Sequence, residues 1–140
     1  MKISARNVLA GEVTEVTRGA VNAEVIVSLQ GGELMTAVIT NGSADSLELA
    51  RGKKAFAIVK ASEVMIGKGL EKAKLSARNI LAGEVAQVTA GAVNSEVVVR
   101  LPGGTEIVAS ITRASVDALE LKTGDQVSAV VKASNVLIGL

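Results

Sequence analysis

Hydrogen-bond donors and small residues recur in this chain at a constant offset of 72 positions. The first set is Ser4, Arg6, Asn7, Gly19, Asn22, Thr40, Ser43, Lys60 and Ser62. The second is Ser76, Arg78, Asn79, Gly91, Asn94, Thr112, Ser115, Lys132 and Ser134. Hydroxyls and amides with one arginine and one lysine per set are typical of a pocket that binds an oxyanion. No pair of repeated carboxylates suggests acid–base catalysis.

Several of these residues also have a purely structural explanation. Ser43 and Ser115 suit the N-cap of a short helix, and Asn22 suits a turn. Arg6 and Lys60 are equally compatible with solvated surface charges. Identity between the two copies does not distinguish a structural from a functional role, because a duplication preserves both.

Structural explanations also exist for other polar residues on the strands. Lys60 and Ser62 interrupt an apolar strand, which is also typical of a β-bulge or a protected sheet edge. Glu12 and Glu24 are predicted to be exposed charges on strands.

The composition excludes several classes of function. The chain has 140 residues, 15 Lys and Arg against 14 Asp and Glu, and no His, Cys, Trp or Tyr. Zinc, haem and iron–sulfur ligation of the usual kinds, thiol nucleophiles and a Ser-His pair are therefore not expected, and we predict no enzyme. Near-neutral charge and a single aromatic residue, Phe56, disfavour nucleic-acid binding.

Hydropathy gives expectations for location and assembly. Arg6, Asn7 and Glu12 interrupt the start of the chain, so it does not resemble a signal peptide. No stretch approaches the roughly 20 apolar residues of a membrane span, and we expect a cytoplasmic protein without membrane contact. Hydrophobic residues make up 49% of the chain. We expect part of this apolar surface to be buried in a homo-oligomer.

The repeats predict two domains. "SARNVLAGEV" (4–13) matches "SARNILAGEV" (76–85), and the correspondence continues without a gap to "VKASNVLIG" (131–139). We place the domains at residues 2–68 and 74–140, with a charged linker at 69–73.

Each repeat is predicted to be mainly β. Residues 23–29 alternate with strand period, "QGG" and "PGG" are hairpin turns, and residues 33–40 form the next strand. A short helix capped by Ser43 or Ser115 and ended by Gly52 or Gly124 follows, then one long strand through "AIVKASEVMI" closes the unit. Two tandem five-stranded Greek-key barrels of the oligonucleotide/oligosaccharide-binding (OB) type, each with a short helix, are the predicted fold.

The motifs "SARNxLxGxV", "GAVNxEV", "AxIT" and "VKAS" together resemble the Mop family of molybdate-binding proteins, in its tandem di-Mop form. The resemblance covers nearly the whole chain. It implies a barrel fold, binding of molybdate or tungstate as the ligand with no cofactor or direct metal ligand, and assembly around a three-fold axis, here as a homotrimer.

The resemblance also implies site residues at unit interfaces. One set is Ser4, Arg6, Lys60, Ala61 and Ser62, with Thr40 and Ser43 approaching from a neighbouring unit. Its counterpart is Ser76, Arg78, Lys132, Ala133 and Ser134 with Thr112 and Ser115. The turns Gly19, Ala20, Val21, Asn22 and Gly91, Ala92, Val93, Asn94 would form a second kind of site near the three-fold axis.

Regulatory relatives in the family carry a DNA-binding domain, and transport relatives an ATPase. We expect neither domain beside the two repeats, which favours intracellular storage and homeostasis of molybdenum. An OB-type module that binds nucleic acid and a purely structural oligomer are the alternatives.

Overall fold

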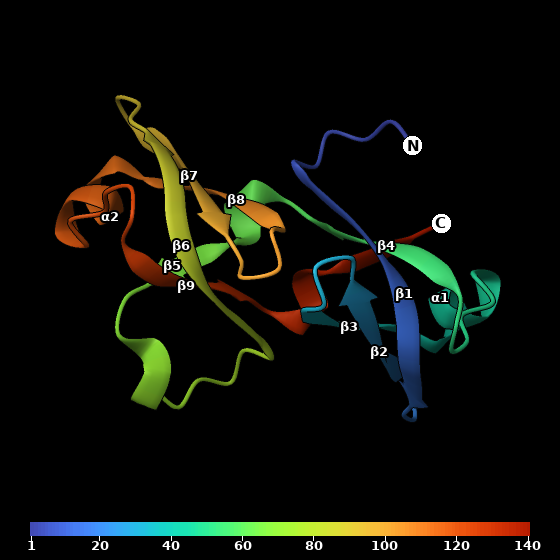
Figure 1. The fold of residues 1–140 in the computed structure, drawn as a ribbon. Coiled ribbons are helices and arrows are strands. Elements are labelled where there is room, and N and C mark those ends of the chain that lie inside the picture. Colours follow the sequence, from blue (N-terminus) through green and yellow to red (C-terminus); the bar gives the residue numbers. More distant parts are fainter.

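The chain folds as two antiparallel five-stranded sheets of the same topology (Figure 1), described by a computed structural model of residues 1–140. The first repeat contains β1 (Asn7–Arg18), β2 (Asn22–Leu29), β3 (Leu34–Thr40), α1 (Asn41–Ser46), β4 (Lys54–Val59), η1 (Ala61–Glu63) and β5 (Met65–Gly67). After η2 (Leu70–Lys72), the second contains β6 (Asn79–Thr89), β7 (Asn94–Arg100), β8 (Glu106–Thr112), α2 (Arg113–Ala118), β9 (Gln126–Val131), η3 (Ala133–Asn135) and β10 (Leu137–Gly139). The predicted mainly β fold with two five-stranded units is confirmed.

Each sheet takes its edge strand from the other repeat. The order in the first sheet is β10-β4-β1-β2-β3, and in the second it is β5-β9-β6-β7-β8. Leu137 of β10 pairs with Ile58 of β4, and Met65 of β5 pairs with Val130 of β9. The two structural units therefore exchange their last strands, although the sequence repeats run one after the other.

The predicted long strand through "AIVKASEVMI" is wrong. The strand β4 ends at Val59, Lys60 leaves the sheet, and the 3-10 turn η1 sends the chain across to the second sheet. Lys60 and Ser62 therefore mark a crossing between units and not a bulge. The bulges lie elsewhere, where the register shifts between Val13 and Glu15 in β1, and in the corresponding part of β6.

The helix prediction is correct in place but wrong at both ends. The N-cap is Thr40, whose Oγ1 accepts a hydrogen bond from the Ser43 backbone N–H at 3.0 Å. The helix α1 begins at Asn41 and ends at Ser46, well before Gly52. Thr112 caps α2 in the same way, through the N–H of Ser115. Threonine takes the cap because its extended backbone is the end of a strand.

Alternating side chains of both sheets build one hydrophobic core. Val25, Val27 and Leu29 of β2 are buried, and the cluster they belong to extends across both repeats. The outer-face residues Ile26 and Val98 are half-buried. In each unit the edge strands approach one another, β10 near β3 and β5 near β8, so each sheet curls toward a barrel.

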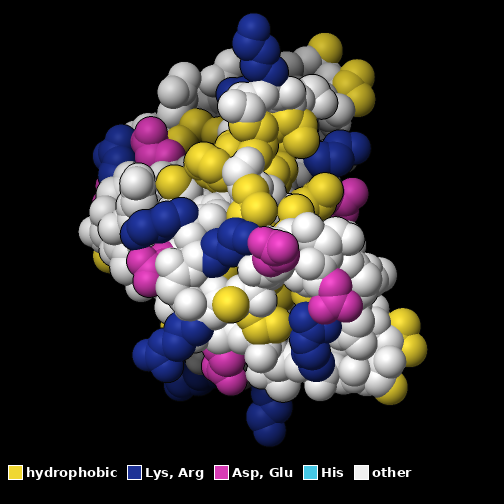
Figure 2. Space-filling model, turned by 90° about the vertical axis from the view of Figure 1, so that its right-hand side faces the viewer, with side chains coloured by type: hydrophobic (Ala, Val, Ile, Leu, Met, Phe, Trp, Pro, Cys, Tyr) yellow, Lys and Arg dark blue, Asp and Glu magenta, His cyan; other side chains and the backbone are white.

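Apolar side chains also remain on the surface. Figure 2 shows hydrophobic side chains gathered on one face, with Lys, Arg, Asp and Glu around them. Val21 and Val93 are the most exposed large apolar residues, at 72% and 76%, and Leu34, Met65 and Leu137 are about half exposed. None of the helices is long and apolar enough to cross a membrane.

Candidate oxyanion-binding site

The repeated "SARN" segments lie where the two units meet. The side-chain amide of buried Asn7 donates to the backbone oxygen of Val108 at 2.8 Å and accepts from its N–H at 2.7 Å. Asn79 makes the same pair of bonds to Thr36, both at 2.8 Å. Each asparagine therefore ties the first strand of one repeat to the third strand of the other. These two donors are structural and are not available to a ligand.

The arginines of the same segments bind glutamates of the opposite repeat. Arg6 Nη1 and Nη2 donate to the two carboxylate oxygens of Glu96, at 2.6 and 3.0 Å. Arg78 makes the same two-point contact with Glu24. These side-chain hydrogen bonds, together with the charge of the glutamate, raise the pKa of both arginines. Neither arginine is thus a free surface charge.

Glu24, predicted to be an exposed strand charge, lies on a strand but is only partly exposed. Its side chain is 31% exposed and belongs to the junction between units. Glu12 does lie on the strand surface, where it accepts a hydrogen bond from Lys54 at 2.8 Å. That bond lowers the pKa of Glu12.

The repeated lysines differ from the arginines in having no anionic partner. Lys60 and Lys132 each stand exposed immediately before a 3-10 turn, η1 or η3, and neither side chain forms a hydrogen bond or an ion pair. An unpaired ammonium group on a rigid turn is able to meet an anion without first breaking another contact.

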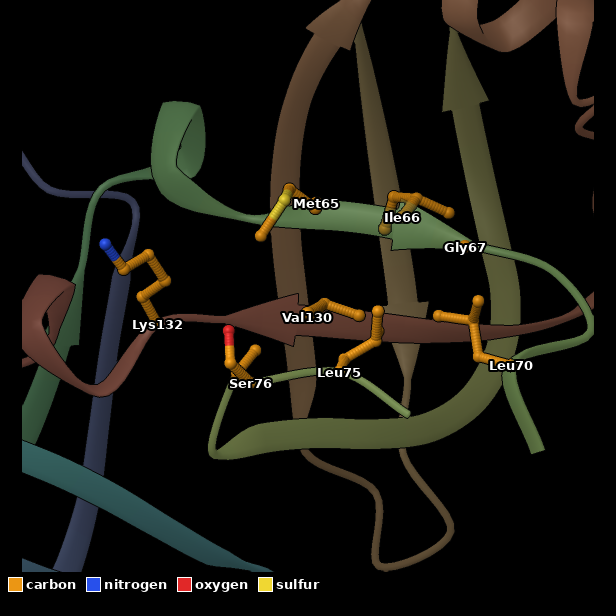
Figure 3. Close-up of a pocket in the computed structure, with 9 residues that line it drawn as sticks. Met65, Ile66, Gly67, Leu70, Leu75, Ser76, Val130 and Lys132 are labelled. Carbon is orange, nitrogen blue, oxygen red and sulfur yellow. The ribbon is translucent and has the colours of Figure 1, made fainter. Parts of the chain in front are cut away.

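Lys132 shares a hollow of about 360 Å³ with the start of the second "SARN" segment (Figure 3). Ser76 and Ala77 line it from one side, and β5 residues such as Met65 line it from another. Figure 3 shows Ser76 and Lys132 at the same end of the hollow, with the amine of Lys132 extended away from the apolar side chains. Ser76 and Lys132, which the sequence assigns to one predicted site, thus line the same hollow.

A second hollow, of about 280 Å³, brings together hydroxyls from both repeats. Thr40 and Ser43 line it with Ser134, and its other walls are apolar residues such as Val38 and Leu137. Thr40 also donates to Ser43 Oγ at 2.9 Å, so these two hydroxyls are hydrogen-bonded to each other. The expected set has Thr40 and Ser43 approach Ser4 and Ser62 from a neighbouring unit, and here Thr40 and Ser43 meet Ser134 of the other repeat. The strand exchange is the cause, because it carries η3 to β3.

The first-repeat residues follow the same rule. The turn η1, with Ala61 and Ser62, lies against β8, whose last residue is Thr112. Thr112 donates to Ser115 Oγ at 2.8 Å, as in the other repeat. Ser4 and Ser62 are exposed, and Ala133 is buried.

The "GAVN" turns join β1 to β2 and β6 to β7, which confirms their assignment as turns. In the first, the Gly19 N–H donates to the Asn22 oxygen at 2.7 Å, and the start of α1 holds the turn through Asn41. The N–H groups of Ala20 and Val21 donate to no acceptor in the chain. The same holds for Ala92 and Val93. Each turn therefore presents two free N–H groups beside an exposed valine.

The structure contains no group of three or more Asp and Glu side chains that could hold a metal ion. All the candidate groups are hydrogen-bond donors, and the chemistry they support is recognition of an anion. Sequence reasoning missed Glu24 and Glu96 as parts of this region. The signal was present in the repeated "GAVNxEV" motif, where the glutamate is retained in both copies.

The TOBE domain family matches residues 3–66 and 75–138, which is most of the chain. This chain belongs to the TOBE family. Its two TOBE domains align along their whole length with a structure of the cytoplasmic molybdate-binding protein ModG with molybdate bound. The TM-score is 0.96, the identity is 51%, and the alignment covers 100% of this chain and 99% of that one.

Curated relatives are also molybdenum-binding or molybdenum transport proteins by name. The molybdenum-pterin-binding protein MopA of Rhodobacter capsulatus is 46% identical over 140 residues, and the molybdenum transport protein ModE of Azotobacter vinelandii is 44% identical. The chain spans only about half of these two relatives, 53% and 52% of their lengths. A probable molybdenum-pterin-binding protein of Haemophilus influenzae is 43% identical over 67 residues, which is 97% of its length. The resemblance to the Mop family is thereby confirmed.

Proposed function

We propose that this tandem TOBE protein binds molybdate reversibly as a tetrahedral oxyanion. The observation that carries the proposal is the position of Lys132. Lys132, whose ammonium group has no partner, lines a hollow together with Ser76 at the junction between the two units. The whole-length similarity to molybdate-bound ModG supports the same ligand. Tungstate, with the same charge and shape, is proposed as a second ligand.

Binding would rest on hydrogen bonds and charge alone. Lys132, Arg78 and Ser76 would donate from the second repeat, together with Ala133 and Ser134 of the η3 turn. Thr40 and Ser43 would donate from the first repeat, because the strand exchange sets them beside Ser134. The symmetrical site would use Ser4, Arg6, Lys60, Ala61 and Ser62 with Thr112 and Ser115. Charge-assisted hydrogen bonds of this kind are short and strong in a partly desolvated pocket.

We also propose a second kind of anion site at the "GAVN" turns. The free N–H groups of Ala20 and Val21, and of Ala92 and Val93, support it. Two N–H groups per turn are too few for a tetrahedral dianion. Several turns would have to converge, as around a three-fold axis.

A homotrimer would bring these turns together and cover the exposed apolar residues. Val21 and Val93, which stand beside the free N–H groups, would then be buried between subunits. Light scattering at micromolar concentration tests the assembly. We expect three chains per particle, and a stable monomer would contradict both the trimer and the shared turn site.

Storage and buffering of molybdate in the cytoplasm is the role we propose for the protein. The similarity to the cytoplasmic protein ModG supports the location. We propose ligand binding without enzymatic activity, which the similarity to a molybdate-binding protein supports.

Equilibrium dialysis against molybdate tests the function directly. The wild type should bind it, and the double variant Lys60→Gln/Lys132→Gln should lose about tenfold or more in affinity per site, because a hydrogen bond to a charged group contributes about 1.5–3 kcal/mol. Lys54→Gln is the matched control, since Lys54 is an exposed lysine paired with Glu12. Equal affinities of all three proteins would show that the anion binds elsewhere.

A further inference from the structure

We propose that Glu24 and Glu96 compete with an oxyanion for the guanidinium groups of Arg78 and Arg6 and so lower the affinity of the proposed site for its ligand. This inference rests on the proposed function and assigns a role to two residues outside the donor set. The carboxylates act as resident anions, and an incoming oxyanion has to share each arginine with one of them.

The geometry of the ion pair supports this role. The carboxylate of Glu96 accepts from both Nη1 and Nη2 of Arg6, the two-point arrangement that a tetrahedral oxyanion also uses. A guanidinium group has five N–H donors, and this contact engages two of them. The remaining donors are able to reach an oxyanion, so the carboxylate and the ligand would be bound by the same guanidinium at the same time.

The position of Glu24 places its charge beside the hydroxyl-lined hollow. Glu24 on β2 is paired in register with Val38 on β3, and Val38 lines the hollow together with Thr40, Ser43 and Ser134. Residues directly opposite on antiparallel strands point to the same face of the sheet. On the other side of the ion pair, Arg78 directly follows Ala77, which lines the hollow of Ser76 and Lys132. Each residue of the ion pair thus neighbours a residue that lines a hollow.

The charges at the junction between the units favour competition between glutamate and ligand over a purely structural role of the ion pair. Each half of the junction carries one arginine neutralised by a glutamate and one lysine with no partner. The exposed fraction of the arginine side chains is 54% and 52%, so solvent and ligands reach them. A dianion bound at such a pair is attracted by the lysine and the arginine but repelled by the carboxylate only a few ångströms away.

The test is calorimetric titration of the complete chain with sodium molybdate. Glutamine keeps the shape of glutamate and one hydrogen bond to the arginine but removes the charge. The double variant Glu24→Gln/Glu96→Gln should bind molybdate at least about fivefold more tightly than the wild type, as expected for removal of one like charge near a dianion in a high-dielectric site. Sulfate, which has the same charge, should gain to a similar extent in competition. Glu12→Gln is the matched control, because Glu12 also forms an exposed ion pair but lines neither hollow.

Each other outcome has a distinct meaning. Weaker binding by Glu24→Gln/Glu96→Gln would show that the glutamates position the arginines and do not compete for them, which overturns the proposal. Unchanged affinity with a lowered melting temperature would show a structural tie only, which also overturns it. Failure of the wild type itself to bind molybdate would instead refute the proposed function.

Discussion

The side chain of Asn7 pairs with the backbone of Val108 as a neighbouring strand would. Its amide donates to the Val108 oxygen and accepts from the Val108 N–H, at 2.8 and 2.7 Å, although the two residues belong to different repeats. Asn79 repeats the arrangement with Thr36. The two units are thus joined by exchanged strands, by asparagine amides and by the arginine–glutamate pairs.

Asn79→Ala should destabilise the fold strongly. The substitution leaves the buried N–H and oxygen of Thr36 without partners, and each such group costs about 1–3 kcal/mol. Chemical denaturation should therefore show a loss of about 2–5 kcal/mol. Asn135→Ala is the control, because the exposed bond from Asn135 to Glu63 contributes little. A loss no larger than that of the control would mean that the amide is not a tie between units.

A fragment of residues 1–68 should form a dimer. In the whole chain β5 pairs with β9 of the second repeat, and β4 pairs with β10 of the second repeat. In the fragment, β5 of each copy would complete the sheet of the other, and Arg6 of each would meet Glu24 of the other. Light scattering should report two chains or a multiple of two. A folded monomer would show that β5 is able to turn back onto its own sheet.

This exchange is the part of the fold that the sequence does not predict. Strands such as β2 are predictable because alternation of buried and exposed side chains is local. The choice of partner sheet is not local. The segments "VMIG" (64–67) and "VLIG" (136–139) are nearly identical, so either fits the edge of either sheet. The direction in which Lys60 and the following turn lead the chain decides which sheet the segment joins.

The site was predictable in composition but not in grouping. The repeated serines, arginines and lysines could be identified because both copies retain them. Their partners could not, since Thr40 meets Ser134 and Arg6 meets Glu96 only through the exchange between repeats. The N-cap was misplaced by three residues because Thr40 and Ser43 are both good caps, and the strand end selects the first.

Gly103→Ala should weaken the contact between the two hairpin turns. A Cβ atom at Gly103 would clash with the backbone oxygen of Gly31, which cannot move without shifting the turn. We expect a loss of about 1–3 kcal/mol in unfolding free energy, the usual cost of overpacking. Gly42→Ala is the control, because the nearest atom to its Cβ is 3.9 Å away. Equal stability of both variants would show that the turns do not press together.

Asp125 should make stability depend on pH in the acid range. Its carboxylate accepts from the Lys122 backbone N–H and lies 3.0 Å from Lys68 Nζ, and these contacts lower its pKa. A lowered folded-state pKa stabilises the fold above the ordinary pKa of about 3.9, and the stabilisation is lost as the pH falls through the lowered value. Asp125→Asn should therefore melt below the wild type at neutral pH and converge with it in acid. Asp117→Asn serves as control, and a constant difference at all pH values would contradict the assignment.

Molybdate affinity should be nearly flat from about pH 6 to pH 9. Lysine and arginine ordinarily lose protons only above about pH 10, and hydroxyls and amides do not titrate in this range. The pairs with Glu24 and Glu96 raise the pKa of Arg78 and Arg6 further. Calorimetric titration at several pH values is the measurement. A steep change centred near pH 6.5 would contradict a site built only from these donors.

Discrimination against sulfate should then come from size, because charge and shape are the same. Sulfate is smaller, so it cannot reach donors from both repeats at once, for example Lys132 on one side and Thr40 on the other. Each donor left unpaired in a desolvated site costs about 1–3 kcal/mol, so sulfate should bind roughly tenfold or more weakly. Tungstate, nearly the size of molybdate, should compete well. Displacement of bound molybdate by equimolar sulfate would mean that the donors do not form one pocket of fixed size.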